Sequence, residues 1–369
     1  MQAIRLNGME EFEQVSSLWN QLWSRSNCQN PNLKSDALGA ACKALYDGNA
    51  HFIILLDADE IVAGIPFVNR NPQGLISTIQ LPNNQWGFWG DILIDSRFSS
   101  IKLVRRLADA VHNLNPETIQ LTLIQNQSDE WQQFLNQLVQ HGRTQFESPA
   151  FEVGLVSLDH DWSDFKSSLS KSFRKKLKRK RKFLQTHGTV KFYHHRIDNQ
   201  ADAERLFKSA FSIEQRSWKA NQKSTIFDSQ MDTFFREQAR LLARSQSLAI
   251  SLLTVNECPI AFEFGALAKQ TYYSWKVGFD QAYSKFSPGQ LLMESLTEHL
   301  CQVESCQQID TVGPLSEATS KWTDHNRQLA TVTVSGSNHL SLMALSTIHW
   351  LKRVTRKSRK IVSQIRQAN

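Results

Sequence analysis

Residues 247–266 read SLAISLLTVNECPIAFEFGA, and this stretch decides the fold. Two apolar runs flank a polar pair at Asn256–Glu257, and short apolar runs joined by such a pair predict a strand, a tight turn and a second strand. Residues 51–68, HFIILLDADEIVAGIPFV, have the same layout around an acidic turn. The sequence therefore predicts two β-hairpins, one in each half of the chain.

Each predicted hairpin is preceded by segments with helical spacing of apolar residues. These segments are 9–24 and 35–47 in the first half, and 201–218 and 229–244 in the second, where a further helix is predicted at 165–185. An internal duplication of roughly 150 to 200 residues explains this order, although any two α/β halves can be slid into partial register. We expect an α/β (α+β) protein with two similar domains, 1–158 and 159–335, and a basic helical tail at 336–369. Each domain is expected to be a mixed, mostly antiparallel sheet flanked by helices.

The composition excludes several classes of protein. With 369 residues, of which 41% are hydrophobic, the chain can bury a full core, which excludes a disordered chain and a disulfide-stabilised miniprotein. Its net charge of +7 comes from two runs without acids: residues 171–182 hold nine basic residues and residues 351–369 hold seven. The rest of the chain is acidic, so the basic runs are local features.

The cysteines and the apolar segments indicate the compartment. Five cysteines, without a CxxC pair, and an N-terminus without an export signal favour a reducing cytosol. No segment is apolar enough to span a membrane. No group of ligands has metal-site spacing, so no metal is expected.

The two copies differ where a helix follows the predicted sheet. After Phe286, the second copy continues Ser287-Pro288-Gly289-Gln290-Leu291, whereas the first has isoleucine in place of the glycine. Proline suits the first position of a helix and glycine lets a ligand approach the backbone. Because a helix N-terminus attracts anions, these five residues are the predicted site for a diphosphate. A plain helix start is the alternative.

Several short motifs follow one another in a familiar order. They are the run SKSFRKKLKRKRKFLQTHG, Glu214 with Ser217-Trp218-Lys219, Pro259-Ile260-Ala261, Tyr272-Tyr273 with Phe279-Asp280, Ser287-Pro288-Gly289, and Asp310, Gly313, Lys321 and Trp322. Together they resemble the GNAT acyltransferases of the BioF-like, CelD-type group, which is similar in architecture to the Fem peptidyltransferases. The resemblance runs from Trp19 to about residue 330 and is strongest over 165–325.

The resemblance implies tandem GNAT-like domains, with a degenerate scaffold first and the acyltransferase second. It also implies an acetyl-CoA or other acyl-CoA donor, whose diphosphate lies at residue 288 and whose pantetheine arm lies between strands at 271–279 and 307–313. The sequence departs from the usual GNAT phosphate loop, because only Gly289 of that loop is present.

Acyl transfer needs a base for the acceptor and a proton donor for the leaving thiolate. Glu263, within Ala261-Phe262-Glu263-Phe264, is the candidate base, because aromatic neighbours would raise its pKa. A carboxylate facing solvent between two inward phenylalanines is the alternative. Asp310, at the end of a predicted strand, is a candidate to orient the acceptor, or else a turn residue. Tyr273 is the candidate leaving-group acid, or else a core residue.

Three further residues are candidates for acceptor binding. Glu214 and Trp218, four apart on one predicted helix, would place a carboxylate beside an aromatic wall; an ordinary amphipathic helix with Trp218 in the core is the alternative. Lys321 would reach the acceptor or a cofactor phosphate, or else lie on the surface.

The two basic runs predict an anionic partner. Residues 171–182 form a cationic helix face suited to nucleic acid, anionic lipid or charged glycan, and 351–369 have the pattern of a membrane-surface helix. A solvated face and a frayed tail are the alternatives.

We therefore expect a cytoplasmic acyltransferase, peripheral at the inner face of the membrane, that moves an acyl group from acyl-CoA to an amine or hydroxyl of a small molecule or glycan. The resemblance places this reaction in cell-envelope or exopolysaccharide metabolism. A Fem-like enzyme that uses aminoacyl-tRNA is the first alternative. A non-catalytic polyanion-binding module that kept the fold is the second.

Overall fold

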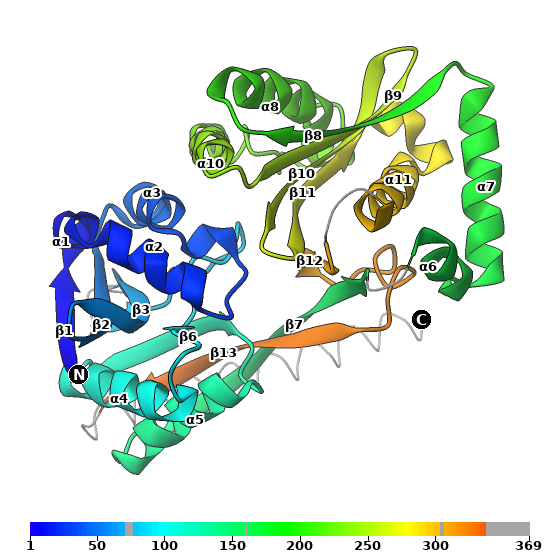
Figure 1. Ribbon diagram of the computed structural model, residues 1–369. Coiled ribbons are helices and arrows are strands. Elements are labelled where there is room, and N and C mark those ends of the chain that lie inside the picture. Colours follow the sequence, from blue (N-terminus) through cyan, green and yellow to red (C-terminus); the bar gives the residue numbers. More distant parts are fainter. Residues whose placement is uncertain (71–76, 159–160, 303–305, 337–369) are drawn as a thin grey trace, which may run out of the picture. The chain divides into compact units, whose positions relative to one another are not determined.

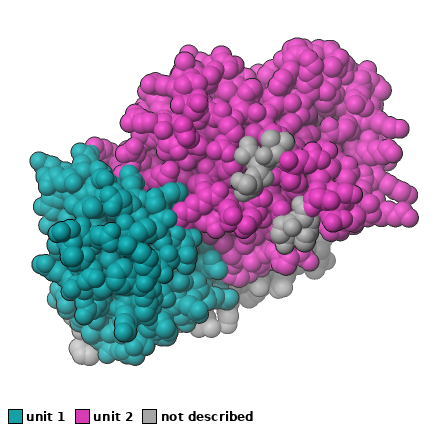
Figure 2. All heavy atoms as spheres, viewed as in Figure 1, with its two compact units in different colours: residues 1–27, 46–150, 329–369 teal, residues 28–45, 151–328 magenta. Residues whose placement is uncertain are grey.

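The computed structural model describes residues 1–70, 77–158, 161–302 and 306–336 (Figure 1). The chain forms two compact units, which Figure 2 shows in different colours. Unit 1 consists of residues 1–27, 46–150 and the chain from 329 onward, and unit 2 of residues 28–45 and 151–328. The expected domain boundary at 158 stays a prediction. The expected helical tail and the basic residues 351–369 lie outside the described residues, apart from residue 336.

Unit 1 is a mixed sheet with helices on it. The strand order is β1-β2-β3-β4-β6-β13-β7, with β5 paired to β3. The strands are β1 (Gln2–Asn7), β2 (Ala50–Asp57), β3 (Glu60–Arg70), β4 (Thr78–Gln80), β5 (Leu93–Ile94), β6 (Thr118–Ile124), β7 (Gln145–Ser157, which ends in unit 2) and β13 (Asn326–Ser335, which begins in unit 2). The helices are α1 (Gly8–Gln14), α2 (Ser16–Arg25), α4 (Ser100–Asn113) and α5 (Asp129–Gln140).

Unit 2 has the strand order β7-β12-β11-β10-β9-β8. Its further strands are β8 (Val190–Ile197), β9 (Leu248–Val255), β10 (Cys258–Ala268), β11 (Thr271–Phe279) and β12 (Gln308–Pro314). Its helices are α3 (Ser35–Tyr46, whose last residue belongs to unit 1), α6 (Trp162–Ser168), α7 (Lys171–Gln185), α8 (Gln200–Glu214), α9 (Trp218–Asn221), α10 (Asp232–Arg244) and α11 (Pro288–Gln302), with 3₁₀ turns η1 (Pro31–Leu33) and η3 (Gln281–Phe286).

The two units share one topology. In unit 1, β1 to β4 pair antiparallel in chain order and β4 then pairs parallel with β6; in unit 2, β8 to β11 do the same and β11 pairs parallel with β12. In both units the helix before the last strand of this series, α4 or α11, follows the fourth strand. The predicted fold class, a mixed and mostly antiparallel sheet flanked by helices in each half, is confirmed.

Both predicted hairpins are present. In the second, Val255 pairs with Cys258, and the two turn residues Asn256 and Glu257 have φ angles of 49° and 62°. Such a two-residue turn with positive φ matches the right-handed twist of the strands it joins. In the first hairpin, Asp57 pairs with Glu60 around the acidic turn.

The predicted helix at 165–185 is wrong in one respect, because two helices, α6 and α7, cover this segment. The chain is extended at Leu169 and Ser170, and the Ser170 side chain accepts a hydrogen bond from the Phe173 N–H at 3.3 Å. A serine that caps a helix N-terminus starts a new helix at the next residue. The basic run therefore occupies a helix of its own.

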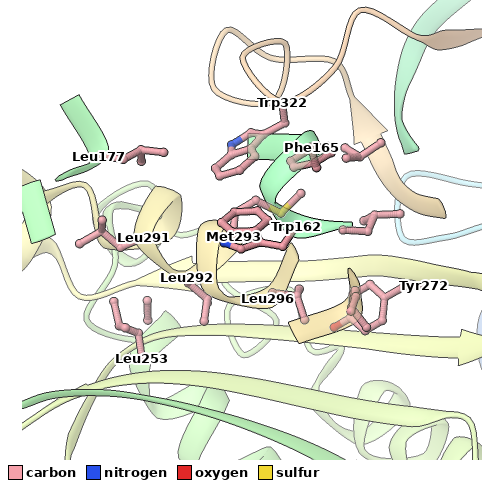
Figure 3. Packing of buried hydrophobic residues seen from close by; sticks show 14 of the residues in the cluster. Trp162, Phe165, Leu177, Leu253, Tyr272, Leu291, Leu292, Met293, Leu296 and Trp322 are labelled. Carbon is pink, nitrogen blue, oxygen red and sulfur yellow. The ribbon is translucent and has the colours of Figure 1, made fainter. Parts of the chain in front are cut away.

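The sheet of unit 2 carries a core on each face. On one face, Leu253 of β9 and Tyr272 of β11 belong to the same cluster as Leu292 and Leu296 of α11, shown in Figure 3 with Trp162 of α6 on the other side of that helix. On the opposite face, the aromatic rings of α8, α10, β10 and β11 pack together, including Phe211, Phe235, Phe262, Phe264 and Trp275. The face on which a sheet residue lies can thus be read from its neighbours.

Unit 1 buries a histidine without a hydrogen-bond partner on either ring nitrogen among the described residues. His51 of β2 is 2% exposed, and burial, with a smaller effect of Arg5, lowers its pKa to about 4. Between the ordinary pKa of histidine and this lowered value, His51 is therefore protonated in the unfolded chain and neutral in the folded state. Stability is unaffected at neutral pH and falls as the pH drops through the range between the ordinary and the lowered pKa.

We expect His51→Phe to remove this pH dependence. Urea unfolding of the variant should lose about 2 kcal/mol less than the wild type between pH 7 and pH 4.5, because the variant has no proton to exclude. Equal losses in the two proteins would show that His51 is protonated in the folded state.

Among the described residues, no helix is long and apolar enough to cross a membrane. Within the same part of the chain, no group of three His, Cys, Asp or Glu side chains is placed to hold a metal ion.

Candidate functional site

Helix α11 begins at Pro288, directly after Ser287, which has a left-handed conformation with φ 56°. The Ser287 carbonyl accepts hydrogen bonds from the N–H groups of Gln290 at 3.0 Å and Leu291 at 3.2 Å. Within the described residues, the Gly289 N–H has no acceptor. A methyl group at Gly289 would lie 3.7 Å from its nearest neighbour, a carbon of Phe279, so there is space beside the backbone. Among the first N–H groups of this helix, that of Gly289 is therefore the one that the described part of the chain leaves available to a ligand. The sequence had predicted several such donors.

Two other predicted cofactor residues, Gln290 and Leu291, have side chains with structural partners. Gln290 accepts a hydrogen bond from the Trp322 indole at 2.9 Å and donates one to the Ala318 carbonyl at 3.3 Å, which ties the 318–322 segment to α11. Leu291 is fully buried in the core under α11. Lys321 pairs with Glu317 at 2.8 Å on the surface, in agreement with the alternative interpretation of this residue.

Strands β11 and β12 separate after a short stretch of parallel pairing. They pair in parallel at three positions, from Thr271 with Gln308 to Tyr273 with Asp310. On its other edge β12 pairs with β7, from Gln308 to Asp310 and, after a register shift, again between Pro314 and Val153; Val312, within the shift, has a φ of 57°. Since parallel strands point the same way, the pairing is lost at their carboxyl ends, the edge where ligands of α/β proteins bind.

Glu263 of β10 is buried on the α11 face of the sheet. The register aligns it with Ser251 of β9 and, beyond that, with His194 of β8. Its side chain is 2% exposed, and burial raises its pKa to about 7, against a weaker opposing hydrogen bond from Ser274. One of its oxygens, Oε1, has no hydrogen-bond partner among the described residues. The alternative of a solvent-facing carboxylate is wrong, because the aromatic residues on either side of Glu263 face the opposite core.

Tyr272 lies on the same face as Glu263 and was not among the predicted site residues. It is fully buried, and burial, with a smaller contribution from Glu263, raises its pKa well above the ordinary value. Gly265 makes room for it, since a Cβ on that glycine would lie 2.6 Å from the tyrosine hydroxyl. The sequence signal for this residue was the Tyr272-Tyr273 pair, whose two members face opposite sides of the strand.

Asp310 and Tyr273 lie on the other face of the sheet. They are paired in the parallel register, and Tyr273 pairs across with Ala266, which alternates with Phe264 on the aromatic side. The Asp310 carboxylate accepts hydrogen bonds from Arg327 at 2.6 Å and from the Val312 N–H at 2.7 Å. Burial raises its pKa, while Arg327 opposes this effect. The structure therefore does not bring the three predicted catalytic residues together, and it adds Arg327.

Glu214 and Trp218 do not share a helix face, which corrects the prediction. Helix α8 ends at Glu214, and Ser217 caps the short helix α9 that begins at Trp218. Trp218 is 44% exposed, so it does not belong to the core either. Nothing in the spacing of the apolar residues signalled this break.

The carboxylate of Glu214 is buried in a polar cluster. It accepts hydrogen bonds from Lys219 Nζ at 3.1 Å and from the Ile226 N–H at 3.0 Å, and Lys219 also donates to the Val277 carbonyl at 3.0 Å. Lys276 lies nearby: burial, with a smaller effect of Lys219, lowers its pKa to about 8, while Glu214 opposes this shift. Glu214 thus fixes the segment between α8 and α10 against β11.

Comparison with known proteins identifies the fold of this region. Residues 171–318 match the family model described as an acetyltransferase (GNAT) domain. No curated protein matches the sequence.

Solved structures with the same fold cover both units. FemX is 9% identical with a TM-score of 0.57, over 90% of this chain and 97% of that one. The C-terminal domain of a protein named as a lysylphosphatidylglycerol synthetase, from Agrobacterium fabrum, is 12% identical with a TM-score of 0.54. The match covers 91% of this chain and 96% of that one. L-PGS from Bacillus licheniformis is 13% identical with a TM-score of 0.52, over 92% and 96%. At these identities the likeness concerns the fold alone.

Proposed function

We propose that the protein is an acyltransferase that moves an acyl group from acyl-CoA, such as acetyl-CoA, to an amine or hydroxyl, with its site in unit 2. The observation that carries this proposal is the loss of pairing between β11 and β12 beyond Tyr273 and Asp310, within the segment matched by the GNAT model. A donor with a diphosphate would be held by the Gly289 N–H, and its pantetheine arm would lie where the two strands part. The same proposal includes a cytoplasmic location, a CelD-type role in envelope or exopolysaccharide metabolism, and a small-molecule or glycan acceptor.

In this proposal Glu263 is the general base. Its pKa of about 7 makes it partly ionised at neutral pH, as a base must be. It would take the proton of the acceptor as nitrogen or oxygen attacks the thioester carbonyl and the carbon–sulfur bond breaks. The thiolate would gain a proton from Tyr273 or Tyr272, which flank the start of the gap on opposite faces. Asp310, held by Arg327, lies on the opposite face of the sheet from Glu263, so in this proposal it positions the end of β12 through the Val312 N–H rather than the acceptor.

We expect coenzyme A to raise the melting temperature of the full chain, and Gly289→Glu to abolish the shift by placing a carboxylate where the diphosphate would lie. Gly289→Ala is the matched control, because the space beside Gly289 accepts a methyl group, so it should keep most of the shift. If coenzyme A causes no shift in the wild type, or if both variants retain it equally, the diphosphate is not held there.

The second candidate is a Fem-like enzyme that takes its acyl group from aminoacyl-tRNA. It is favoured by the row of cations on α7. Retention of tRNA at moderate salt, without a coenzyme A shift, would support it, whereas neither effect would favour the non-catalytic polyanion-binding module.

A further inference from the structure

A groove lined almost entirely by cations runs along α7. It has a volume of about 800 Å³ and lies between α7, Lys166 of α6 and Glu294 of α11. Figure 1 shows α7 at the edge of unit 2, beside α6 and α11. Besides Lys166 and Glu294, the lining comes from α7: Lys171, Arg174, Lys175, Lys178, Arg181, Lys182 and Gln185. We call this the basic groove; its volume lies within the range of ligand sites, ~300–1,000 Å³.

The carboxylate in the basic groove is already neutralised. Glu294, whose side chain is 7% exposed, pairs with Lys166 at 3.3 Å and with Arg181 at 2.9 Å. In the part of the chain that the structure describes, none of the other five cations of the groove forms an ion pair. Like charges on successive turns of a helix repel each other. The groove therefore has an excess of positive charge that an external anion would relieve.

The spacing of these cations fits a linear anion. Lys171, Lys175, Lys178 and Lys182 recur at intervals of three or four residues, so they follow one face of α7. At 1.5 Å per residue the row is about 16 Å long. A single phosphate would engage two or three of these groups, whereas a row of this length matches a chain of phosphates.

A membrane surface fits less well. Three apolar residues of α7, Phe173, Leu177 and Leu184, are buried in the core of unit 2 and cannot insert into lipid. Phe183 is 45% exposed, but it packs against Phe286 and does not line the groove, so a single ring of this helix is left for contact with lipid. The cations also line a groove, which a flat bilayer cannot fill. Because none of the groove residues is aromatic, bases have nothing to stack on, and recognition would depend on phosphates alone.

We propose that the basic groove binds the phosphodiester backbone of a nucleic-acid strand without regard to sequence. This inference goes beyond the acyl-CoA reaction; it uses the same cations of α7 as the second candidate function, in which the bound strand would belong to the aminoacyl-tRNA donor. Each phosphate contacted releases counterions, so affinity should fall steeply with salt.

The test is fluorescence anisotropy of short labelled RNA and DNA strands of one mixed sequence, titrated with the full chain at several salt concentrations. Lys175→Gln/Lys178→Gln removes two groove cations, and Lys176→Gln/Arg179→Gln removes two exposed cations of the same helix that do not line the groove. The groove pair should weaken binding roughly tenfold and reduce the log–log salt slope by about 1.4, which corresponds to two phosphates of a single strand. The control pair should change affinity less than twofold.

Several outcomes separate the possibilities. Binding of RNA alone, or of RNA and DNA alike, with the groove pair defective, supports the proposal and identifies the source of the phosphates. Equal weakening by both pairs, or no binding by the wild type, overturns it. So does a groove-dependent affinity for phosphatidylglycerol vesicles without affinity for either strand. Because all four residues are exposed, melting temperatures and the coenzyme A shift should stay unchanged, which keeps this result separate from that of the acyl-CoA proposal.

Discussion

Replacing Glu263 with glutamine is expected to lower kcat by roughly 10²- to 10⁴-fold, the contribution of a general base. The amide has the shape of the carboxyl group but cannot take a proton. Release of free thiol from acetyl-CoA, followed with a panel of amine and hydroxyl acceptors such as amino sugars, measures the rate. In the wild type the rate should rise with pH and level off above about pH 7, because burial raises the pKa of Glu263 to about 7 and the ionised form is the base.

Glu257→Gln is the matched control for this experiment. Glu257 lies at the turn of the same hairpin, is exposed and pairs with Lys191, so its loss should change kcat less than twofold. The coenzyme A shift should be the same in both variants, which separates catalysis from binding. A folded Glu263→Gln enzyme with a near-normal rate would exclude the base role.

Replacing Arg327 with methionine should destabilise the protein by about 3–5 kcal/mol at pH 7, because it leaves the buried charge of Asp310 without its partner. The Asp310 carboxyl is 2% exposed and Arg327 lies 2.6 Å from it. Without Arg327 the pKa of Asp310 rises further above that of the unfolded chain. The cost is therefore largest above that raised pKa and shrinks as the pH falls and the folded state takes up a proton. Urea unfolding at pH 7 and at pH 4 would measure both effects.

A second variant shows whether charge or packing is responsible. Asp310→Asn combined with Arg327→Met removes both charges, and it should recover part of the stability that the single Arg327 variant loses. Glu317→Gln, which breaks the exposed pair with Lys321, should cost less than ~0.5 kcal/mol. If the loss in Arg327→Met is the same at both pH values, the residue acts through packing.

The sequence was sufficient to predict the hairpins and the repeated order of elements, whereas it left open whether Glu263 is buried or faces solvent. Apolar runs and turn residues are local signals in the sequence. Because the same order of elements occurs in both halves of the chain, the prediction for one half strengthens that for the other. The relative placement of Glu263 and Asp310 was not predictable in the same way. They come to lie on opposite faces because of the register across β10, β11 and β12, and the β10–β11 register shifts between Phe264 and Gly265. A shift of one residue reverses the face of every residue beyond it.

Contacts between residues that are far apart in the chain could not be predicted from the sequence either. Arg327, which holds Asp310, lies on β13, and no pattern near either residue links them. The break between Glu214 and Trp218 depends on Ser217, whose capping competes with a helical pattern that continues past it. At residue 288 the sequence predicted the helix start correctly, but the number of available donors depends on how the Ser287 carbonyl is shared.

The division of the chain bears on how the protein can be dissected. Unit 2 takes in residues 28–45 as well as 151–328, and the chain returns to unit 1 from residue 329 onward. No single cut releases either half intact: a fragment that starts at 159 lacks α3, whose Ala37 carbonyl accepts a hydrogen bond from the buried Gln238 side chain at 3.1 Å. Each unit is therefore built from stretches of chain that lie on both sides of the other unit's sequence, so the two are expected to be expressed and studied together.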